Sequence, residues 1–392
     1  MSIFQNNLLA AAAAAASGGG GEEGTLWAWG GAESGGLGDG TTTNKCSPVQ
    51  IGDSENWANL GIGDDTSVAV NSDGELYAWG YNGQGQVGDG TTTSRSSPVQ
   101  IGSLTDWSTQ GGHLINGIDK SMAAIKTDGT LWTWGKNNQG QLGHGNKTVN
   151  SSPVQVGSLT DWAFISGCDT AMAAVKTDGT LWTWGDNGDG MLGLGDTTNR
   201  SSPTQVGSLT TWSNIGAMEA GFGAVRTDGT IWTWGKNDNA QLGDGSQTNR
   251  SSPVQVGDLS DWKGPLGGSK YAEHVVKSDG TLWTWGYNYE NAQMGLDRSE
   301  GGFVTSPIQV GALTIWNEED GNPMKTVSGG ITSRVALKTD GTIWGWGKNE
   351  YGQAGQGNTT VLSSPSQIGT DDTWLNIVMG ANSKHVLAIK ST

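Results

Sequence analysis

The stretch "DGTLWTWG" at residues 128–135 decides the fold, because the chain repeats it along its length. It returns unchanged at 178–185 and 279–286, and with one or two changes at 228–235 and 340–347. The glycine that closes each Trp-x-Trp-Gly recurs at steps of 50, 55, 50, 50, 51 and 61 residues. A period near 50 residues is typical of stacked or radial repeat architectures.

Each repeat contains four short runs of strand-forming residues, as residues 171–216 show. Two apolar runs flank Asp178-Gly179, and Asp-Gly between such runs predicts a two-residue hairpin of type I′. A glycine-rich stretch follows, and then "SPTQV" at 202–206, where Pro203 is expected at the start of a strand. The last strand of the unit is expected to begin near Trp212. The unit therefore predicts about four antiparallel strands.

The twenty tryptophans occupy three positions of this unit. Thirteen belong to the Trp-x-Trp pair, whose fourteenth place is taken by Tyr77, and seven stand near the start of the last strand. Because side chains alternate along a strand, Trp182 and Trp184 are expected on one face. Large aromatics at such positions are expected to fill the space between neighbouring sheets rather than to bind a ligand.

The two ends of the chain complete one repeat between them. Residues 385–392 align with the run before an Asp-Gly turn, and residues 24–30 align with the run after it. The fold class is therefore expected to be all-β: a seven-bladed β-propeller of four-stranded antiparallel blades, with the ring closed by N- and C-terminal strands in one blade. The expected domains are a short helical N-terminal segment with a glycine linker, residues 1–23, and the propeller, residues 24–392.

The unit W-x-W-G-x-N…Q-L-G-x-G…S-P-x-x-V resembles the regulator of chromosome condensation repeat family, over about residues 24–392. This resemblance implies the propeller fold, which hosts unrelated functions. The founding member implies chromatin binding and nucleotide exchange on a nuclear GTPase, which are not expected of a chain with a net charge of −17 and no basic tail. A plant member implies photoreception, which is not expected because the chain contains no Trp-Arg. Bacterial members imply binding proteins, including one that inhibits an enzyme.

The composition argues against several other classes of function. With 21 basic and 38 acidic residues, the chain is a poor partner for nucleic acid and for anionic membrane surfaces. No apolar stretch is long enough to span a bilayer. Cys46 and Cys168 match no metal-binding spacing, the four histidines form no H-E-x-x-H, and "DNGDG" at 186–190 resembles a calcium loop only incompletely. Neither enzymatic activity nor a cofactor is expected.

Two insertions break the period, and function is expected where the scaffold stops repeating. The first lies at 109–121, and the second is divided between 287–306 and 317–330. Tyrosine beside polar residues suits a protein-binding surface, although loops can also drift without acquiring a partner. The candidate partner-binding residues in the insertions are His113, Tyr287, Tyr289, Phe303, Glu318 and Glu319.

The first 23 residues, "MSIFQNNLLAAAAAAASGGGGEE", lie outside the repeats. The alanine-rich part predicts a short helix, and the glycines predict a linker. Such a segment is either a secretory signal peptide or an anchor, but a signal peptide is disfavoured because the first basic residue is Lys45. The opening residues resemble those of structural proteins of marine bacteriophages. The candidate anchor residues are Ile3, Phe4, Leu8 and Leu9.

The sequence therefore favours a non-enzymatic bacteriophage virion structural protein, such as a tail fibre, decoration or adsorption component. Residues 1–23 would bind other virion proteins, and the propeller loops would bind a host surface protein or glycan. The alternative is a secreted bacterial propeller, extracellular or periplasmic, that binds or inhibits a protein partner. Neither nucleic acid binding nor membrane insertion is expected.

Overall fold

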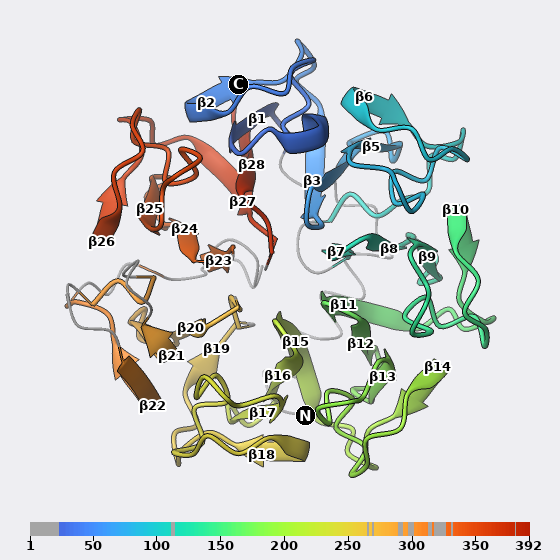
Figure 1. The fold of residues 1–392 in the computed structure, drawn as a ribbon, viewed down its shortest axis with the longest axis vertical. Coiled ribbons are helices and arrows are strands. Elements are labelled where there is room, and N and C mark those ends of the chain that lie inside the picture. Colours follow the sequence, from blue (N-terminus) through green and yellow to red (C-terminus); the bar gives the residue numbers. More distant parts are fainter. Residues whose placement is uncertain are drawn as a thin grey trace.

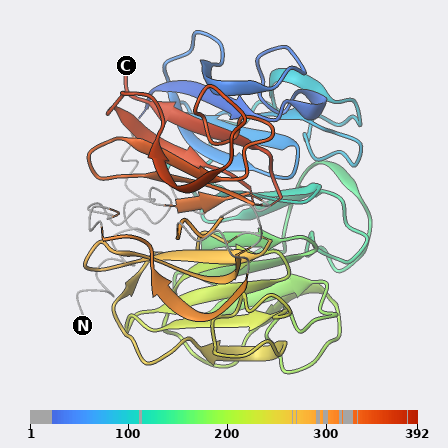
Figure 2. The ribbon, with the colours of Figure 1, turned by 60° about the vertical axis from the view of Figure 1, so that its left-hand side comes forward.

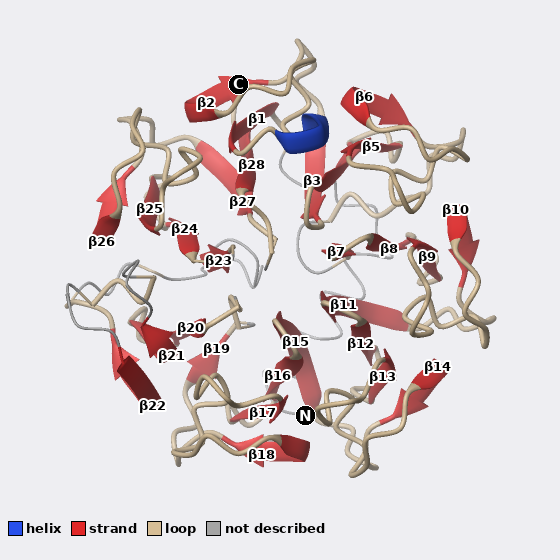
Figure 3. Ribbon diagram, in the orientation of Figure 1, coloured by secondary structure: helices blue, strands red, loops and turns tan. Residues whose placement is uncertain are grey.

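The computed structural model describes residues 23–110, 114–264, 266–268, 270–288, 293–296, 302–312, 316, 327–330, 332–380 and 382–392. Seven four-stranded antiparallel sheets lie radially around a central axis (Figure 1), and seen from the side neighbouring sheets lie face over face (Figure 2). This arrangement confirms the seven-bladed propeller. The helical structure in the described residues is the single turn η1 (Glu33–Gly35) (Figure 3). The helix expected within residues 1–23 falls almost wholly on residues 1–22, outside the described part of the chain.

We number the blades in chain order and write each from its innermost to its outermost strand. Blade 1 comprises β3 (Trp57–Ile62), β4 (Thr66–Asn71), β5 (Leu76–Gly80) and β6 (Arg95–Gln100). Blade 2 comprises β7 (Ile115–Ile118), β8 (Ser121–Ile125), β9 (Leu131–Gly135) and β10 (Asn150–Gln155). Blade 3 comprises β11 (Trp162–Cys168), β12 (Ala171–Lys176), β13 (Leu181–Gly185) and β14 (Arg200–Gln205). Blade 4 comprises β15 (Trp212–Met218), β16 (Gly221–Arg226), β17 (Ile231–Gly235) and β18 (Arg250–Gln255). Blade 5 comprises β19 (Trp262–Lys263), β20 (Ala272–Lys277), β21 (Leu282–Asn288) and β22 (Gly302–Gln309). Blade 6 comprises β23 (Val327–Gly329), β24 (Ser333–Leu337), β25 (Ile343–Gly347) and β26 (Leu362–Gln367), and blade 7 comprises β27 (Trp374–Val378), β28 (His385–Lys390), β1 (Thr25–Gly30) and β2 (Lys45–Gln50).

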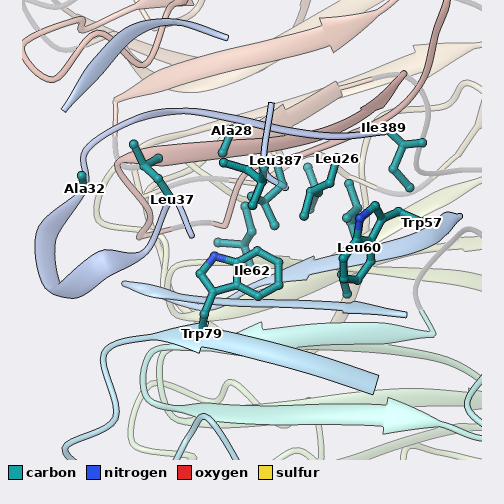
Figure 4. Packing of buried hydrophobic residues seen from close by; sticks show 13 residues of the cluster. Leu26, Ala28, Ala32, Leu37, Trp57, Leu60, Ile62, Trp79, Leu387 and Ile389 are labelled. Carbon is teal, nitrogen blue, oxygen red and sulfur yellow. The ribbon is translucent and has the colours of Figure 1, made fainter. Parts of the chain in front are cut away.

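The ring is closed in blade 7, as the two half-repeats at the chain ends predict. Strand β28 pairs with β1 in antiparallel register from Thr25 opposite Lys390 to Gly30 opposite His385. Apolar side chains of these two strands pack on blade 1, where Figure 4 shows them facing Trp57 and Trp79. The first and last strands of the propeller therefore share one blade and one hydrophobic core.

Two details of the predicted repeat are wrong. The strand that begins at Trp212 pairs with β16 and is the innermost strand of the next blade, so the blade boundary lies before this tryptophan. Pro203 lies inside β14, not at its start. It is tolerated there because β14 is the outermost strand and its ladder with β13 is interrupted by a register shift.

The predicted type I′ turn is also wrong, although the hairpin is present. In blade 2 the amide of Gly129 donates to the carbonyl of Lys126 at 3.0 Å, and the amide of Lys126 donates to the carbonyl of Thr130 at 3.0 Å. Gly129 has a φ of +78°, whereas Asp128 is not among the positive-φ residues of the described chain. This pattern is typical of a three-residue hairpin loop with glycine at the left-handed position. The carboxylate of Asp128 favours it by accepting the amide of Thr130 at 2.9 Å.

The tryptophans hold neighbouring blades together, as their positions predict. The second tryptophan of each pair is fully buried, and in blade 3 the indole N–H of Trp184 donates to the carbonyl of Gln141 in blade 2 at 2.9 Å. The first tryptophan, Trp182, is half-buried and donates to the hydroxyl of Thr180 in its own hairpin. Each blade is thus bonded as well as packed to the blade before it.

Candidate binding face

The two faces of the ring differ in what they carry. The loop face carries the connections from the first to the second strand and from the third to the fourth strand of each blade. The turn face carries the Asp-Gly turns and the connections between blades. The first half of the second insertion joins the ends of β21 and β22, at Asn288 and Gly302, on the loop face, whereas residues 317–326 precede β23 in the connection between blades 5 and 6.

An aromatic patch on the loop face of blade 5 consists of Tyr271, Tyr287 and Phe303. The rings of Tyr287 and Phe303 lie 4.9 Å apart at an angle of 35°, and those of Tyr271 and Tyr287 lie 6.4 Å apart at 73°. The two tyrosines are half-buried, whereas Phe303 is 51% exposed. The exposed ring of Phe303 therefore packs against the partly buried ring of Tyr287, which in turn contacts Tyr271.

The patch exists because blade 5 extends its outer ladder. In blade 3 the pairing of the third and fourth strands ends at Gly185, opposite Arg200. In blade 5 the pairing continues beyond the equivalent glycine, so that Tyr287 faces Phe303 across β21 and β22. The amide of Tyr287 also donates to the carbonyl of Tyr271 at 2.7 Å. The insertion therefore lengthens two strands and places an aromatic residue on each.

The inner end of the patch is charged. The ammonium of Lys270 lies 5.7 Å from the centre of the Tyr271 ring and pairs with Glu219 at 2.9 Å. The hydrogen bond to Glu219 raises the pKa of Lys270. Aromatic and charged side chains thus continue from the outermost strand of blade 5 toward the central axis.

Carboxylates of several blades lie on the loop face, in the connections from the first to the second strand. Burial, followed by the charges of Asp65 and Asp119, raises the pKa of Asp64 to about 7. Burial also raises the pKa of Asp169, whose carboxylate accepts a hydrogen bond from Asn382 of blade 7. This bond joins blades that are not neighbours and ties the inner loops together.

A buried polar cluster joins blades 5 and 6. The guanidinium of Arg334 donates to Nδ1 of His274 at 3.1 Å and to the carbonyls of Ala272 and Ser333 at 2.8 and 2.7 Å. Burial, followed by the charge of Arg334, holds the pKa of His274 well below its ordinary value, which keeps this acceptor neutral. Glu273 and Arg334 occupy, beside two short inner strands, the position at which blades 2, 3, 4 and 7 carry an apolar residue. We interpret this cluster as a structural clasp.

Other titratable groups are committed to structural contacts. His385 lies between Ser67 at 2.8 Å and Ser383 at 2.9 Å, and burial lowers its pKa to about 4. Both Ser67 and His385 are sealed from solvent, which argues against a nucleophile there. The carboxylates of Asp186 and Asp189, in the calcium-like stretch, accept hydrogen bonds from Thr170 and Asn249. Within the described ranges, no cluster of three or more His, Cys, Asp and Glu side chains has a metal-binding arrangement. No helix in those ranges is long and apolar enough to cross a bilayer.

The structure brings two of the candidate residues into contact, Tyr287 and Phe303. The other candidates lie outside the described residues: Ile3, Phe4, Leu8, Leu9, His113, Tyr289, Glu318 and Glu319. The sequence interpretation missed Tyr271, the carboxylates of Asp64 and Asp169, and the cluster of Arg334 and His274. A signal was available for the clasp, because Glu273 and Arg334 occupy the repeat position of Met122 and Met172.

The chain is similar in fold to solved propellers. It superposes on yeast RCC1, crystallised with Kap60, with a TM-score of 0.80 and 15% identity over 95% of this chain and 90% of that chain. It superposes on human WBSCR16 with a TM-score of 0.78 and 18% identity over 94% and 99% of the two chains. At these identities the likeness shows the fold alone.

Curated relatives are similar over shorter stretches. Protein pim1 of Schizosaccharomyces pombe is 28% identical over 143 residues, which cover 32% of this chain and 25% of that protein. The ultraviolet-B receptor UVR8 of Arabidopsis thaliana is 30% identical over 114 residues, which cover 29% and 24%. The chain thus spans about a quarter of the length of these relatives.

The repeat pattern itself covers most of the propeller. The regulator of chromosome condensation (RCC1) repeat matches residues 23–70, 73–110, 128–170, 178–221, 228–264 and 340–389. Because these segments make up more than half of the sequence, the chain belongs to the regulator of chromosome condensation repeat family.

Proposed function

We propose that this chain is a non-enzymatic binding propeller that holds a protein partner on the aromatic patch of its loop face. The observation that carries the proposal is the half-exposed ring of Phe303, which packs against the ring of Tyr287 at an angle of 35°. Aromatic anchors with few rotatable bonds are the residues that most often dominate protein interfaces. One similar propeller supports a binding role, because yeast RCC1 (Prp20) was solved bound to Kap60 and also binds Gsp1p and histones.

The test is site-specific photocross-linking in material from the natural source. Benzoylphenylalanine replaces Phe303 in one variant and Val361 in the other, which is 41% exposed on the loop-face side of blade 6. The proposal expects a discrete cross-linked protein from position 303 and none from position 361. Equal yields from both positions, or no protein adduct at position 303, contradict it.

The proposal also includes display on a bacteriophage virion through residues 1–23, with a host surface protein or glycan as the partner of the loops. The point of exit supports this orientation. The amide of Gly24 donates to the carbonyl of Trp57 at 3.0 Å, at the turn-face end of β3. A propeller anchored through the preceding residues therefore presents the opposite face, which carries the aromatic patch.

Deletion of residues 1–20 tests the anchor. We expect the truncated propeller to fold and to be lost from particles, because its described core begins only at β1. Truncated protein that still enters particles contradicts the anchor. A natural protein whose first residue lies between Ser17 and Glu22 favours the alternative, a secreted bacterial binding propeller.

A further inference from the structure

We propose that the aromatic patch binds an arginine side chain in an extended, basic segment of the partner. This inference rests on the proposed function and names the chemistry of the partner that the patch recognises. It depends on three features: the geometry of the two rings, the net charge of the chain, and the pairs that cations and aromatic rings form within the propeller.

The geometry favours a flat ligand group. Tyr287 supports one side of the Phe303 ring at 4.9 Å with an angle of 35°, and half of Phe303 remains exposed. A planar guanidinium can lie against such a ring and add a third layer to the stack. The ammonium of Lys270 already lies 5.7 Å from the centre of the Tyr271 ring, so we expect the ligand to contact Phe303.

The charge favours a cation. The whole chain carries −17, and the connection between the paired residues Asn288 and Gly302 has three acidic residues and one basic residue in its sequence. A field of this sign attracts basic segments and repels acidic ones.

The propeller uses the same recognition inside its own blades. Lys176 lies 4.5 Å from the centre of the Trp182 ring in blade 3, and Arg226 lies 5.6 Å from that of Trp232 in blade 4. In these pairs the cation and the ring come from adjacent strands of one sheet. At the patch, an extended partner segment would supply the cation to the ring of Phe303 in the same way.

The test measures the binding of fluorescent arginine-glycine, lysine-glycine and glutamate-glycine repeat peptides of equal length to the full chain, in about 0.15 M salt. We expect the arginine peptide to bind tightest, because a guanidinium stacks on an aromatic ring better than an ammonium does. Phe303→Ala should weaken it roughly fivefold, and Phe303→Tyr should retain it because the ring is kept. The matched control Val361→Ala, on the same face, should leave binding unchanged.

Several results would overturn the inference. Equal affinities for the arginine and lysine peptides, with no effect of Phe303→Ala, would mean that net charge alone binds them. If a neutral oligosaccharide binds at Phe303 and the arginine peptide does not, the patch would be assigned to glycans. If position 303 cross-links to a partner segment without arginine, the proposed function stands and this inference fails. If position 303 cross-links to no protein, both fail.

Discussion

At the scale of single residues, blade 1 differs from the other blades at three positions of the repeat that interact with one another. In most blades a basic residue lies over the first tryptophan, as Lys176 does over Trp182 at 4.5 Å. In blade 1 the corresponding residues are Asn71 and Tyr77, and both donate to the carboxylate of Glu75, at 2.8 and 2.9 Å. The sequence shows Tyr77 as a departure, but only the contacts explain it: three substitutions exchange a cation–aromatic pair for a hydrogen-bonded one.

Asp64 gives a pH-dependent prediction at this scale. Its folded pKa of about 7 exceeds the ordinary 3.8, because the carboxyl is buried and faces Asp65 and Asp119, with Lys120 and Lys384 as weaker opposing charges. The folded state therefore holds a proton that the unfolded state has lost, so stability falls as pH rises from about 4 to 7 and is then level.

We expect Asp64→Asn to raise the melting temperature at pH 8 and to change it little at pH 4, since asparagine removes the charge. Thermal unfolding across this range measures the difference. Asp258→Asn, at an exposed position in the connection that follows β18, is the matched control. A gain for Asp64→Asn that is the same at every pH would contradict the assigned cause.

At the scale of strands and blades, the sequence pattern predicts the features that depend on residues close together in the chain. The hairpins follow from Asp-Gly between apolar runs, and the inward tryptophans follow from alternation. The blade boundary and the turn type depend on hydrogen-bonding partners that the repeat alone does not identify. The same holds for the aromatic patch. Tyr287 and Phe303 could be predicted because they lie in the insertion, whereas Tyr271, about sixteen residues before Tyr287, could not be predicted from the repeat pattern.

The bonds between blades predict unequal effects for the two tryptophans of a pair. Trp184→Phe should cost about 2–3 kcal/mol of unfolding free energy, because it leaves a cavity and removes the buried bond to Gln141 of blade 2. Trp182→Phe should cost about 1 kcal/mol, because that indole is half-buried and bonds within its own hairpin. Denaturant unfolding of both variants measures the difference, and equal losses would contradict the role of the cross-blade bond.

At the scale of the whole molecule, ring closure was predictable because residues 385–392 and residues 24–30 together match one repeat. We expect deletion of residues 386–392 to cost about 5 kcal/mol or more, since β28 carries four fully buried side chains, Val386, Leu387, Ala388 and Ile389. Thermal unfolding measures the loss, and an unchanged melting curve would contradict closure through β28.

Two controls separate closure from truncation. Deletion of Ser391 and Thr392 alone removes exposed residues beyond β28 and should change little. A circular permutant that joins Thr392 directly to Gly24, with new ends in the exposed connection between Gly207 and Ser208, should fold, because Lys390 and Thr25 are already paired. A permutant that fails to fold would argue against a seventh hairpin at the junction.

We propose that the ring is anchored on its turn face and presents its loop face to a partner. The most direct measurement is maleimide labelling of single cysteines in a Cys46→Ser background, in which the remaining Cys168 is buried. Val361→Cys on the loop face and Leu209→Cys on the turn face replace side chains of similar exposure, 41% and 43%. In assembled bacteriophage particles we expect position 361 to label as fast as in free protein and position 209 to be protected. Equal labelling of the two positions, or protection of position 361 instead, would contradict it.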